Sequence, residues 1–157
     1  MQGGLTRFSD MTRVDFYILG PGNNSRDKLA CALAGKAMGQ GLNVHIHTDD
    51  RETAVVMDDL LWTFRDISFI PHGLADERDL NYTPVCIGWN GMNPDNREIL
   101  INLGTEIPEF AGSFARVMEI VVSDDDSRSQ SRDHYRRYRD MGFEMHSHEL
   151  ESDNATI

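Results

Sequence analysis

The stretch Arg13-Val14-Asp15-Phe16-Tyr17-Ile18-Leu19 is followed directly by Gly20-Pro21-Gly22. Its aromatic and β-branched residues favour a strand, and the glycines and the proline end that strand. Residues 26–40 then carry apolar side chains at helical spacing, residues 42–47 form a second apolar run, and residues 51–64 repeat the helical pattern. A succession of strand, helix, strand and helix is typical of a βαβα unit on a parallel sheet. The sequence therefore predicts an α/β fold.

The second half of the chain contains further short apolar runs. Strands are predicted at residues 85–89, 98–103 and 117–122, and the alternating residues 143–148 predict an edge strand. A short helical turn is predicted at residues 108–114, which begin with proline. Together with the first unit, these elements predict a three-layer α/β sandwich with a mainly parallel sheet.

The length of 157 residues fits one domain. We expect that domain over residues 12–148, with residues 1–11 as a disordered extension and residues 149–157 as a flexible tail. No apolar run reaches the ~18 residues of a membrane-spanning helix, and no apolar signal-peptide region is present. We therefore expect a cytoplasmic protein without a membrane partner. Cys31 and Cys86 lie in apolar segments and are expected to be buried, reduced thiols.

The composition is acidic, with a formal net charge of −11. A negative field repels phosphate, so broad nonspecific binding of DNA is not expected. Any contact with nucleic acid would have to be local.

The segment Gly20-Pro21-Gly22 stands where a phosphate-binding loop would lie, between a first strand and a helix. No G-x-G-x-x-G or G-K-[ST] pattern continues it, and proline lacks the N–H that would cradle a phosphate. We therefore predict a topology like that of nucleotide-binding proteins without a nucleotide site, and no cofactor.

The histidine pairs His45/His47 and His146/His148 have the H-x-H spacing of some metal sites. Neither pair has carboxylates or cysteines at matching spacing, so we expect strand-end histidines and no metal. No serine or cysteine has the surroundings of a nucleophile, and no acid and base are paired along the chain. An enzyme active site is not predicted.

The stretch of residues 128–139 reverses the charge of the chain, because it contains five arginines and one aspartate. Arg128, Arg132 and Arg136 recur every four residues and therefore lie on one face of a helix, with Tyr135 beside them. Arginine binds carboxylate or phosphate through paired hydrogen bonds. Three interpretations remain open: a site for nucleic-acid phosphate, a site for an acidic peptide with a free carboxylate, or a solvated face paired with the chain's many acidic residues.

The ends of this helix are also marked in the sequence. Three consecutive aspartates, at residues 124–126, suit the positive end of a helix dipole, and Gly142 suits a left-handed C-cap. Tyr138 and Met141 lie on another face of the helix and are expected to contact the core.

A second notable region is rich in aromatic residues and proline. It contains Trp62, Phe69, Ile70, Pro71 and Leu74. A region of this composition forms either part of the core or an exposed interface patch.

Short motifs occur in a fixed order along the chain: Phe16–Leu19, Leu61–Trp62, Phe69–Leu74, Pro84–Trp89, Glu98–Leu103, Phe110 with Phe114, and Arg132-x-x-Tyr135-Arg136-x-Tyr138-Arg139-x-x-Gly142-Phe143. Their order and spacing resemble those of the chi subunit of bacterial DNA polymerase III, a family associated with the clamp loader. The resemblance extends over nearly the whole chain.

The resemblance implies an α/β fold without a working nucleotide site, no catalysis by this chain, and two partners. One partner is the psi subunit, which connects chi to the clamp loader. The other is the acidic C-terminal tail of single-stranded-DNA-binding protein, which ends in Pro-Phe with a free carboxylate. DNA would then be reached indirectly, through the complex.

The resemblance also assigns residues to each partner. The tail site is assigned to Arg128, Arg132, Tyr135, Arg136, Gly142 and Phe143, and the surface facing psi to Trp62, Phe69, Pro71, His72 and Leu74. The resemblance therefore favours an interface role over a core role for the residues of the surface facing psi. Two alternatives remain: direct binding of single-stranded nucleic acid by residues 128–139, with Tyr135 and Tyr138 stacking on bases, and a nucleotide-dependent enzyme at the loop after the first strand.

Overall fold

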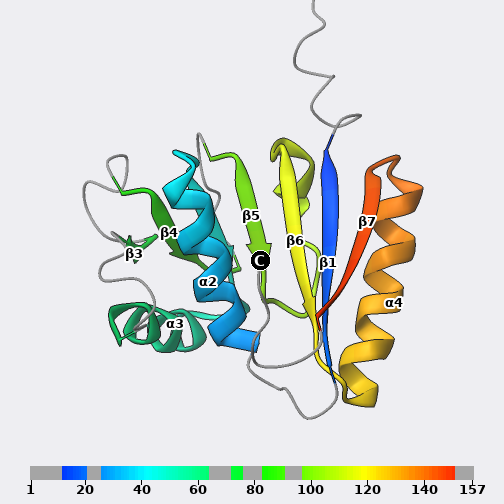
Figure 1. The fold of residues 1–157 in the computed structure, drawn as a ribbon, viewed down its shortest axis with the longest axis horizontal. Helices are drawn as coiled ribbons and strands as arrows, with labels where there is room; N and C mark the ends of the chain where they lie inside the picture. Colours follow the sequence, from blue (N-terminus) through cyan, green and yellow to red (C-terminus); the bar gives the residue numbers. More distant parts are fainter. Residues whose placement is uncertain (1–11, 21–25, 64–71, 76–82, 91–96, 151–157) are drawn as a thin grey trace, which may run out of the picture.

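The computed structural model describes residues 12–20, 26–63, 72–75, 83–90 and 97–150 (Figure 1). The predicted disordered extension, residues 1–11, lies outside these ranges, so that prediction stays untested.

One sheet of seven strands forms the centre of the described structure. The strands are β1 (Arg13–Leu19), β2 (Val44–His47), β3 (His72–Leu74), β4 (Val85–Gly88), β5 (Ile99–Asn102), β6 (Arg116–Val121) and β7 (Glu144–Leu150). Their spatial order is β3-β4-β2-β5-β6-β1-β7, and every described pairing is parallel. The predicted parallel sheet is confirmed, and β7 is an edge strand as expected.

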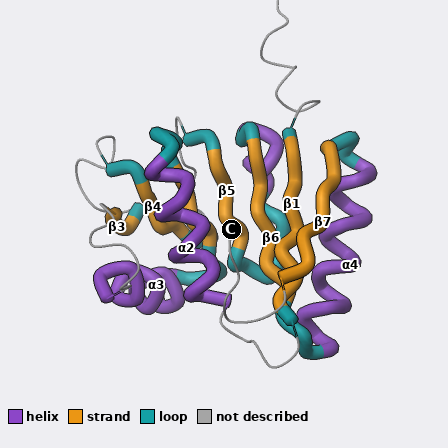
Figure 2. Tube along the Cα trace, viewed as in Figure 1, coloured by secondary structure: helices purple, strands orange, loops and turns teal. Residues whose placement is uncertain are grey.

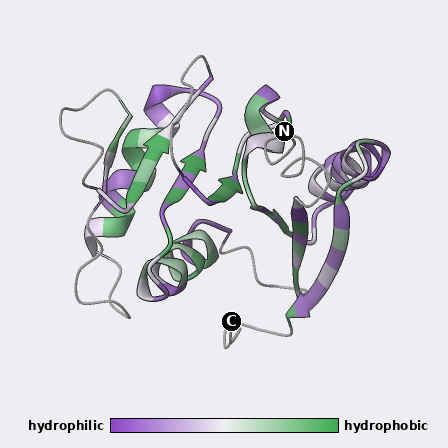
Figure 3. Cartoon of the chain, turned by 90° about the horizontal axis from the view of Figure 1, so that it is seen from above, coloured by the Kyte–Doolittle hydropathy of each residue, from purple (hydrophilic) through white to green (hydrophobic). Residues whose placement is uncertain are grey.

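Helices cover both faces of the sheet (Figures 1 and 2). The helices α2 (Arg26–Gly39) and α3 (Arg51–Thr63) pack on one face, and α4 (Asp125–Asp140) and the short 3-10 helix η2 (Glu109–Ser113) pack on the other. The three-layer sandwich is therefore confirmed. Viewed from above, the central strands carry many hydrophobic residues between these layers, and the edge strand β7 and α4 at one end of the sheet are mostly hydrophilic (Figure 3).

Two apolar clusters hold the layers together. The first joins α2 and α3 to the sheet through side chains such as Leu33, Met57 and Ile46. The second joins α4 and η2 to the opposite face through Phe114 and Tyr138, among others. Successive strand residues point to opposite faces, so buried parallel strands contribute to both clusters at once.

Two expectations about the C-terminal part of the domain are wrong. The strand β7 continues through Glu149 and Leu150, so a flexible tail cannot begin at residue 149. Leu150 pairs with Leu19 of β1 and packs against the first cluster, which extends the strand. Met141, expected to contact the core, has 51% of its surface exposed. It follows the last residue of α4 as its C-cap, and Phe143 is the buried residue instead.

Candidate functional site

The helix α4 starts and stops where its sequence signals lie. The Asp124 side chain accepts a hydrogen bond of 2.7 Å from the Ser127 backbone N–H, so Asp124 is the N-cap. Asp125 and Asp126 occupy the positive end of the helix dipole. Gly142 has φ +88°, the left-handed conformation that glycine adopts at little cost.

A buried polar cluster anchors α4 to the sheet. The Glu119 carboxylate on β6 accepts hydrogen bonds from the Tyr138 hydroxyl at 2.6 Å and from the Asn102 amide at 2.9 Å. The His134 Nδ1 lies 3.1 Å from the other Glu119 oxygen, and its Nε2 lies 3.0 Å from the Thr105 carbonyl oxygen. Both partners of His134 are acceptors, so both ring nitrogens donate and the ring is an imidazolium.

The pKa of His134 agrees with that geometry. Burial lowers the pKa, but the hydrogen bond and the charge of Glu119 outweigh burial and raise the pKa above its ordinary value. Burial and the same carboxylate raise the pKa of Tyr138 well above its ordinary value. The prediction that no acid and base are paired is wrong, because Glu119 and His134 form a buried pair. The available signal was one glutamate inside the apolar strand at residues 117–122.

The predicted arginine face of α4 is exposed, and only some of the arginines of this helix form ion pairs with described residues. Arg137 forms an ion pair with Asp133 at 3.1 Å. The Arg136–Asp133 and Arg139–Asp140 contacts are longer, at 3.7 Å each. Arg128 and Arg132 are exposed, and their side chains have no ion pair in the described ranges. The interpretation of a face fully paired with neighbouring acids therefore does not hold for the first two arginines.

The aromatic members of the predicted tail site lie at different depths. Tyr135 is half-buried, and its ring centroid lies 5.5 Å from that of Phe16 on β1. Phe143 is buried and stacks on Tyr138 at 5.9 Å, while Gly142 beside it is exposed. The structure thus presents Tyr135 and Gly142 at the surface and places Phe143 beneath it.

The predicted psi surface is described only in part. Trp62, near the end of α3, has 58% of its surface exposed, and its ring centroid lies 4.5 Å from that of His72. The His72 Nε2 lies 3.1 Å from the Asp58 carbonyl oxygen and 3.2 Å from an Asp58 carboxylate oxygen. Leu74 is buried in the core. Phe69 and Pro71 lie outside the described residues.

Of the two histidines of β2, His47 is the last residue of the strand, as expected, whereas His45 lies inside it. His45 and His47 are buried under Phe110, and His45 also contacts Phe114. Burial is the main cause that lowers the pKa of His45 to about 3 and the pKa of His47 below its ordinary value. Across the described ranges, no three histidines, cysteines or carboxylates are grouped to hold a metal ion. Cys31 and Cys86 are buried thiols, as expected.

A cleft of about 780 Å³ lies where the strands end, the usual ligand position in such sheets. Its described charged lining consists of Asp27, Asp49, Asp124 and Asp126, with Arg26 and Lys28. This excess of carboxylates disfavours a bound phosphate. Of the predicted Gly-Pro-Gly loop, residues 21 and 22 lie outside the described residues.

Comparison with known proteins shows the family to which this chain belongs. The family model described as DNA polymerase III chi subunit, HolC, matches residues 11–146. This chain belongs to the DNA polymerase III chi subunit family. The resemblance noted in the sequence is thereby confirmed, and the chain is placed among the accessory subunits of DNA polymerase III in DNA replication.

Curated relatives support the same family. The chi subunit of Pseudomonas aeruginosa is 42% identical over 89% of this chain and 98% of its own length. The chi subunit of Escherichia coli is 32% identical over 87% of this chain and 97% of its own.

Among solved structures, T4 UvsW aligns with a TM-score of 0.64 at 10% identity, over 90% of this chain and 42% of that one. This likeness concerns the fold alone. In the described ranges, no helix is long and apolar enough to cross a membrane.

Proposed function

We propose that this chi-family chain is a non-catalytic adaptor, and that α4 binds the acidic C-terminal tail of single-stranded-DNA-binding protein. The observation that carries the proposal is the pair of exposed arginines, Arg128 and Arg132, one helical turn apart and without an ion pair in the described ranges. The chain as a whole has a net charge of −11 and repels an acidic peptide, whereas such a local positive pair attracts it. Binding of the peptide is therefore directed to this pair.

The rest of the site fits a peptide that ends in an aromatic residue with a free carboxylate. The arginine forks supply paired donors for carboxylates. The Tyr135 ring packs against Phe16, which fixes its orientation, and a terminal phenylalanine can pack against its exposed part. Arg136 continues the same face, and the 3.7 Å contact with Asp133 leaves it only loosely engaged. A Cβ added at Gly142 would meet no described atom within 4 Å, so the surface there is open, and Phe143 supports the site from below by packing on Tyr138.

The second part of the proposal is a psi-binding surface at the end of α3. An indole exposed to this extent is uncommon on a free surface and frequent in interfaces. His72 packs against Trp62 and is itself held by Asp58, so the indole has a preferred orientation before any partner arrives. Leu74 supports this surface from the core. The expected contributions of Phe69 and Pro71 remain predictions.

The non-catalytic part of the proposal is supported by the position of the paired acid and base. Glu119 on β6 and His134 on the buried side of α4 are bonded to each other, and Glu119 also accepts a hydrogen bond from Tyr138 of α4. Their role is to hold the arginine helix in position, and a substrate has no access to them.

The tail site is tested by fluorescence anisotropy with a labelled acidic peptide that ends in Pro-Phe-COO⁻. Arg132→Ala and Arg128→Ala should each weaken binding about ten-fold, the value of one charge-assisted pair. Arg137→Ala is the matched control, because Arg137 lies on the other side of α4 and pairs with Asp133. The same peptide with a C-terminal amide should bind less tightly. Equal losses in Arg132→Ala and Arg137→Ala would contradict a site on this face.

The psi surface is tested by calorimetry with the psi subunit as titrant. Trp62→Ala should reduce the affinity by 30-fold or more, about 2 kcal/mol for an aromatic interface residue. Val56→Ala is the control, because Val56 is on the same helix and is similarly exposed, at 56% against 58%. Unchanged binding in Trp62→Ala would place the psi contact elsewhere.

Direct binding of single-stranded nucleic acid is disfavoured by one observation. Tyr138, one of the two expected stacking residues, is completely buried and bonded to Glu119. An oligonucleotide titration in parallel with the peptide decides between the two. Tight, strongly salt-dependent oligonucleotide binding without peptide binding would replace the adaptor proposal.

A further inference from the structure

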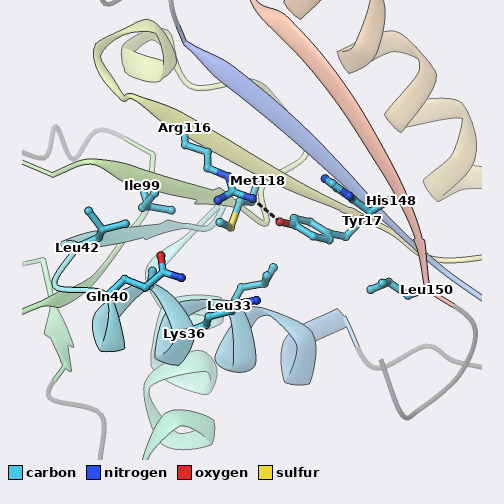
Figure 4. A pocket seen from close by; sticks show the side chains of 11 residues that line it. Tyr17, Leu33, Lys36, Gln40, Leu42, Ile99, Arg116, Met118, His148 and Leu150 are labelled. Atoms are coloured by element: carbon cyan, nitrogen blue, oxygen red, sulfur yellow. Dashed lines mark hydrogen bonds between the residues drawn. The ribbon is translucent and has the colours of Figure 1, made fainter. Parts of the chain in front are cut away.

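The face of the sheet opposite α4 carries a cationic cleft that the proposed adaptor function does not use. On this face α2 packs against β2, β5 and β6, and no described helix covers β1 and β7 (Figure 1). A cleft of about 290 Å³ lies along the edge of α2 (Figure 4). Its polar lining comes from Lys36 and Gln40 on α2, Arg116 on β6, Tyr17 on β1 and His148 on β7.

A buried carboxylate fixes the floor of this cleft. The Asp15 side chain is fully buried and accepts hydrogen bonds from the Arg13 guanidinium at 3.0–3.1 Å and from Arg116 Nε at 2.6 Å. The His148 Nε2 lies 2.7 Å from the same carboxylate. Burial raises the pKa of Asp15, but these hydrogen bonds outweigh burial and hold the pKa below its ordinary value. Asp15 is therefore a carboxylate at neutral pH.

The cleft keeps an excess of positive charge after this pairing. Asp15 bonds to two guanidinium groups, and the charge of Glu144 also acts on Arg13, so the surplus positive charge of the cleft comes from Lys36. The Lys36 side chain is exposed and has no ion pair within the described ranges. This excess stands out against the net charge of −11 of the chain.

Arg116 is held in one orientation and retains free donors. Its Nε is used by Asp15 and one Nη2 hydrogen by the Tyr17 hydroxyl, at 2.7 Å (Figure 4). Both Nη1 hydrogens and the second Nη2 hydrogen have no partner in the described structure. A cation that is already oriented loses little side-chain entropy when it binds an anion.

The remainder of the cleft is apolar. Leu33 on α2, Met118 on β6 and Leu150 on β7 line it beside the cationic groups. Its volume is near the lower end of the ~300–1,000 Å³ usual for small-molecule sites. We propose that this cleft binds a small amphiphilic anion, with one carboxylate or phosphate group on Arg116 and Lys36 and an apolar group against Leu33 and Met118.

The test is an NMR titration of the whole ¹⁵N-labelled chain with four probes: 3-phenylpropanoate, phenyl phosphate, inorganic phosphate and the uncharged 3-phenylpropanamide. Ligands of this size bind with a Kd on the order of 1 mM. The first two probes should shift the signals of Lys36, Gln40 and His148, and the tighter of the two identifies the anion as carboxylate or phosphate. The last two should bind at least several-fold more weakly, because each lacks one half of the proposed ligand.

Matched variants locate the binding. Lys36→Gln should raise the Kd about three-fold, as expected for an exposed charge, while Lys28→Gln on the same helix should leave it unchanged. Arg132→Ala should also have no effect, because α4 lies on the other face, so this result is independent of the tail site. The proposal is overturned by signal shifts outside the cleft, by equal binding of the amide and the carboxylate, or by equal effects of Lys28→Gln and Lys36→Gln.

Discussion

The buried His45 of β2 makes the stability of this protein sensitive to mild acid. His45 has no exposed surface, and neither of its ring nitrogens has a hydrogen-bond partner among the described residues. Burial, reinforced by the nearby His47 and Arg97, lowers the pKa of His45 to about 3. In the unfolded chain the imidazole regains its ordinary pKa of about 6.5. Between these two pKa values, His45 is protonated in the unfolded chain and neutral in the folded protein.

The sign and size of the effect follow from this difference. Because the folded pKa is depressed, the stability is complete above about pH 6.5 and is lost as the pH falls toward 3. A difference of about 3.5 between the two pKa values corresponds to about 5 kcal/mol, at 1.36 kcal/mol per pH unit. About 2 kcal/mol of this is already lost at pH 5, a large share of the ~5–15 kcal/mol that stabilises a typical domain.

Urea unfolding between pH 7.5 and 5 measures the loss, and His45→Leu isolates it. Leucine is apolar and similar in size, so the variant should be at least as stable as the wild type at pH 7.5. Its stability should fall less steeply with pH, by up to about 1.4 kcal/mol per unit. Some slope should remain, because the pKa of His47 is lowered too. Ile46→Leu, on the same strand and facing the other side, should keep the wild-type slope. Identical slopes in His45→Leu and the wild type would refute the reasoning.

Three further predictions concern stability. Glu119→Gln should cost about 3–5 kcal/mol in urea unfolding, because it leaves a buried imidazolium without its anion, and NMR titration should show a lower pKa for His134. Gly142→Ala should cost about 1–2 kcal/mol through its backbone alone, because φ is +88° and no atom of the described residues lies within 4 Å of an added Cβ; a loss well above this would contradict that cause. Gly88→Ala places a Cβ 2.6 Å from the His45 ring and should cost about 1–3 kcal/mol. A double-mutant cycle with His45→Ala should recover most of that loss.

Local structure in this chain follows closely from local sequence. The strand of residues 13–19 occurs where its aromatic and β-branched residues predicted it, and the helix after it occurs where apolar residues recur at helical spacing. The start of α4 at Asp124 and its end before Gly142 also follow from single residues, because capping depends on one side chain and one backbone conformation. The exposed arginine face required only the four-residue spacing of a helix.

The depth of particular side chains was less predictable. Met141 and Phe143 are both apolar and lie on either side of the glycine that ends α4, yet only Phe143 is buried. The chain reverses at Gly142, so the direction of the following residues depends on how the helix packs. His45 likewise lies under η2, whose position relative to β2 has no local signal.

Amino-acid order alone determined the α/β class, the parallel sheet, the family and the arginine face of α4, because each depends on short-range periodicity or on motifs in sequence order. The tertiary structure decided the two polar clusters. Asp15 meets Arg116 and His148, and Glu119 meets His134, only because the strand order places β1 between β6 and β7 and lays α4 over β6. Periodicity shows which face of a strand is apolar, but it carries no information about which distant strand will become its neighbour.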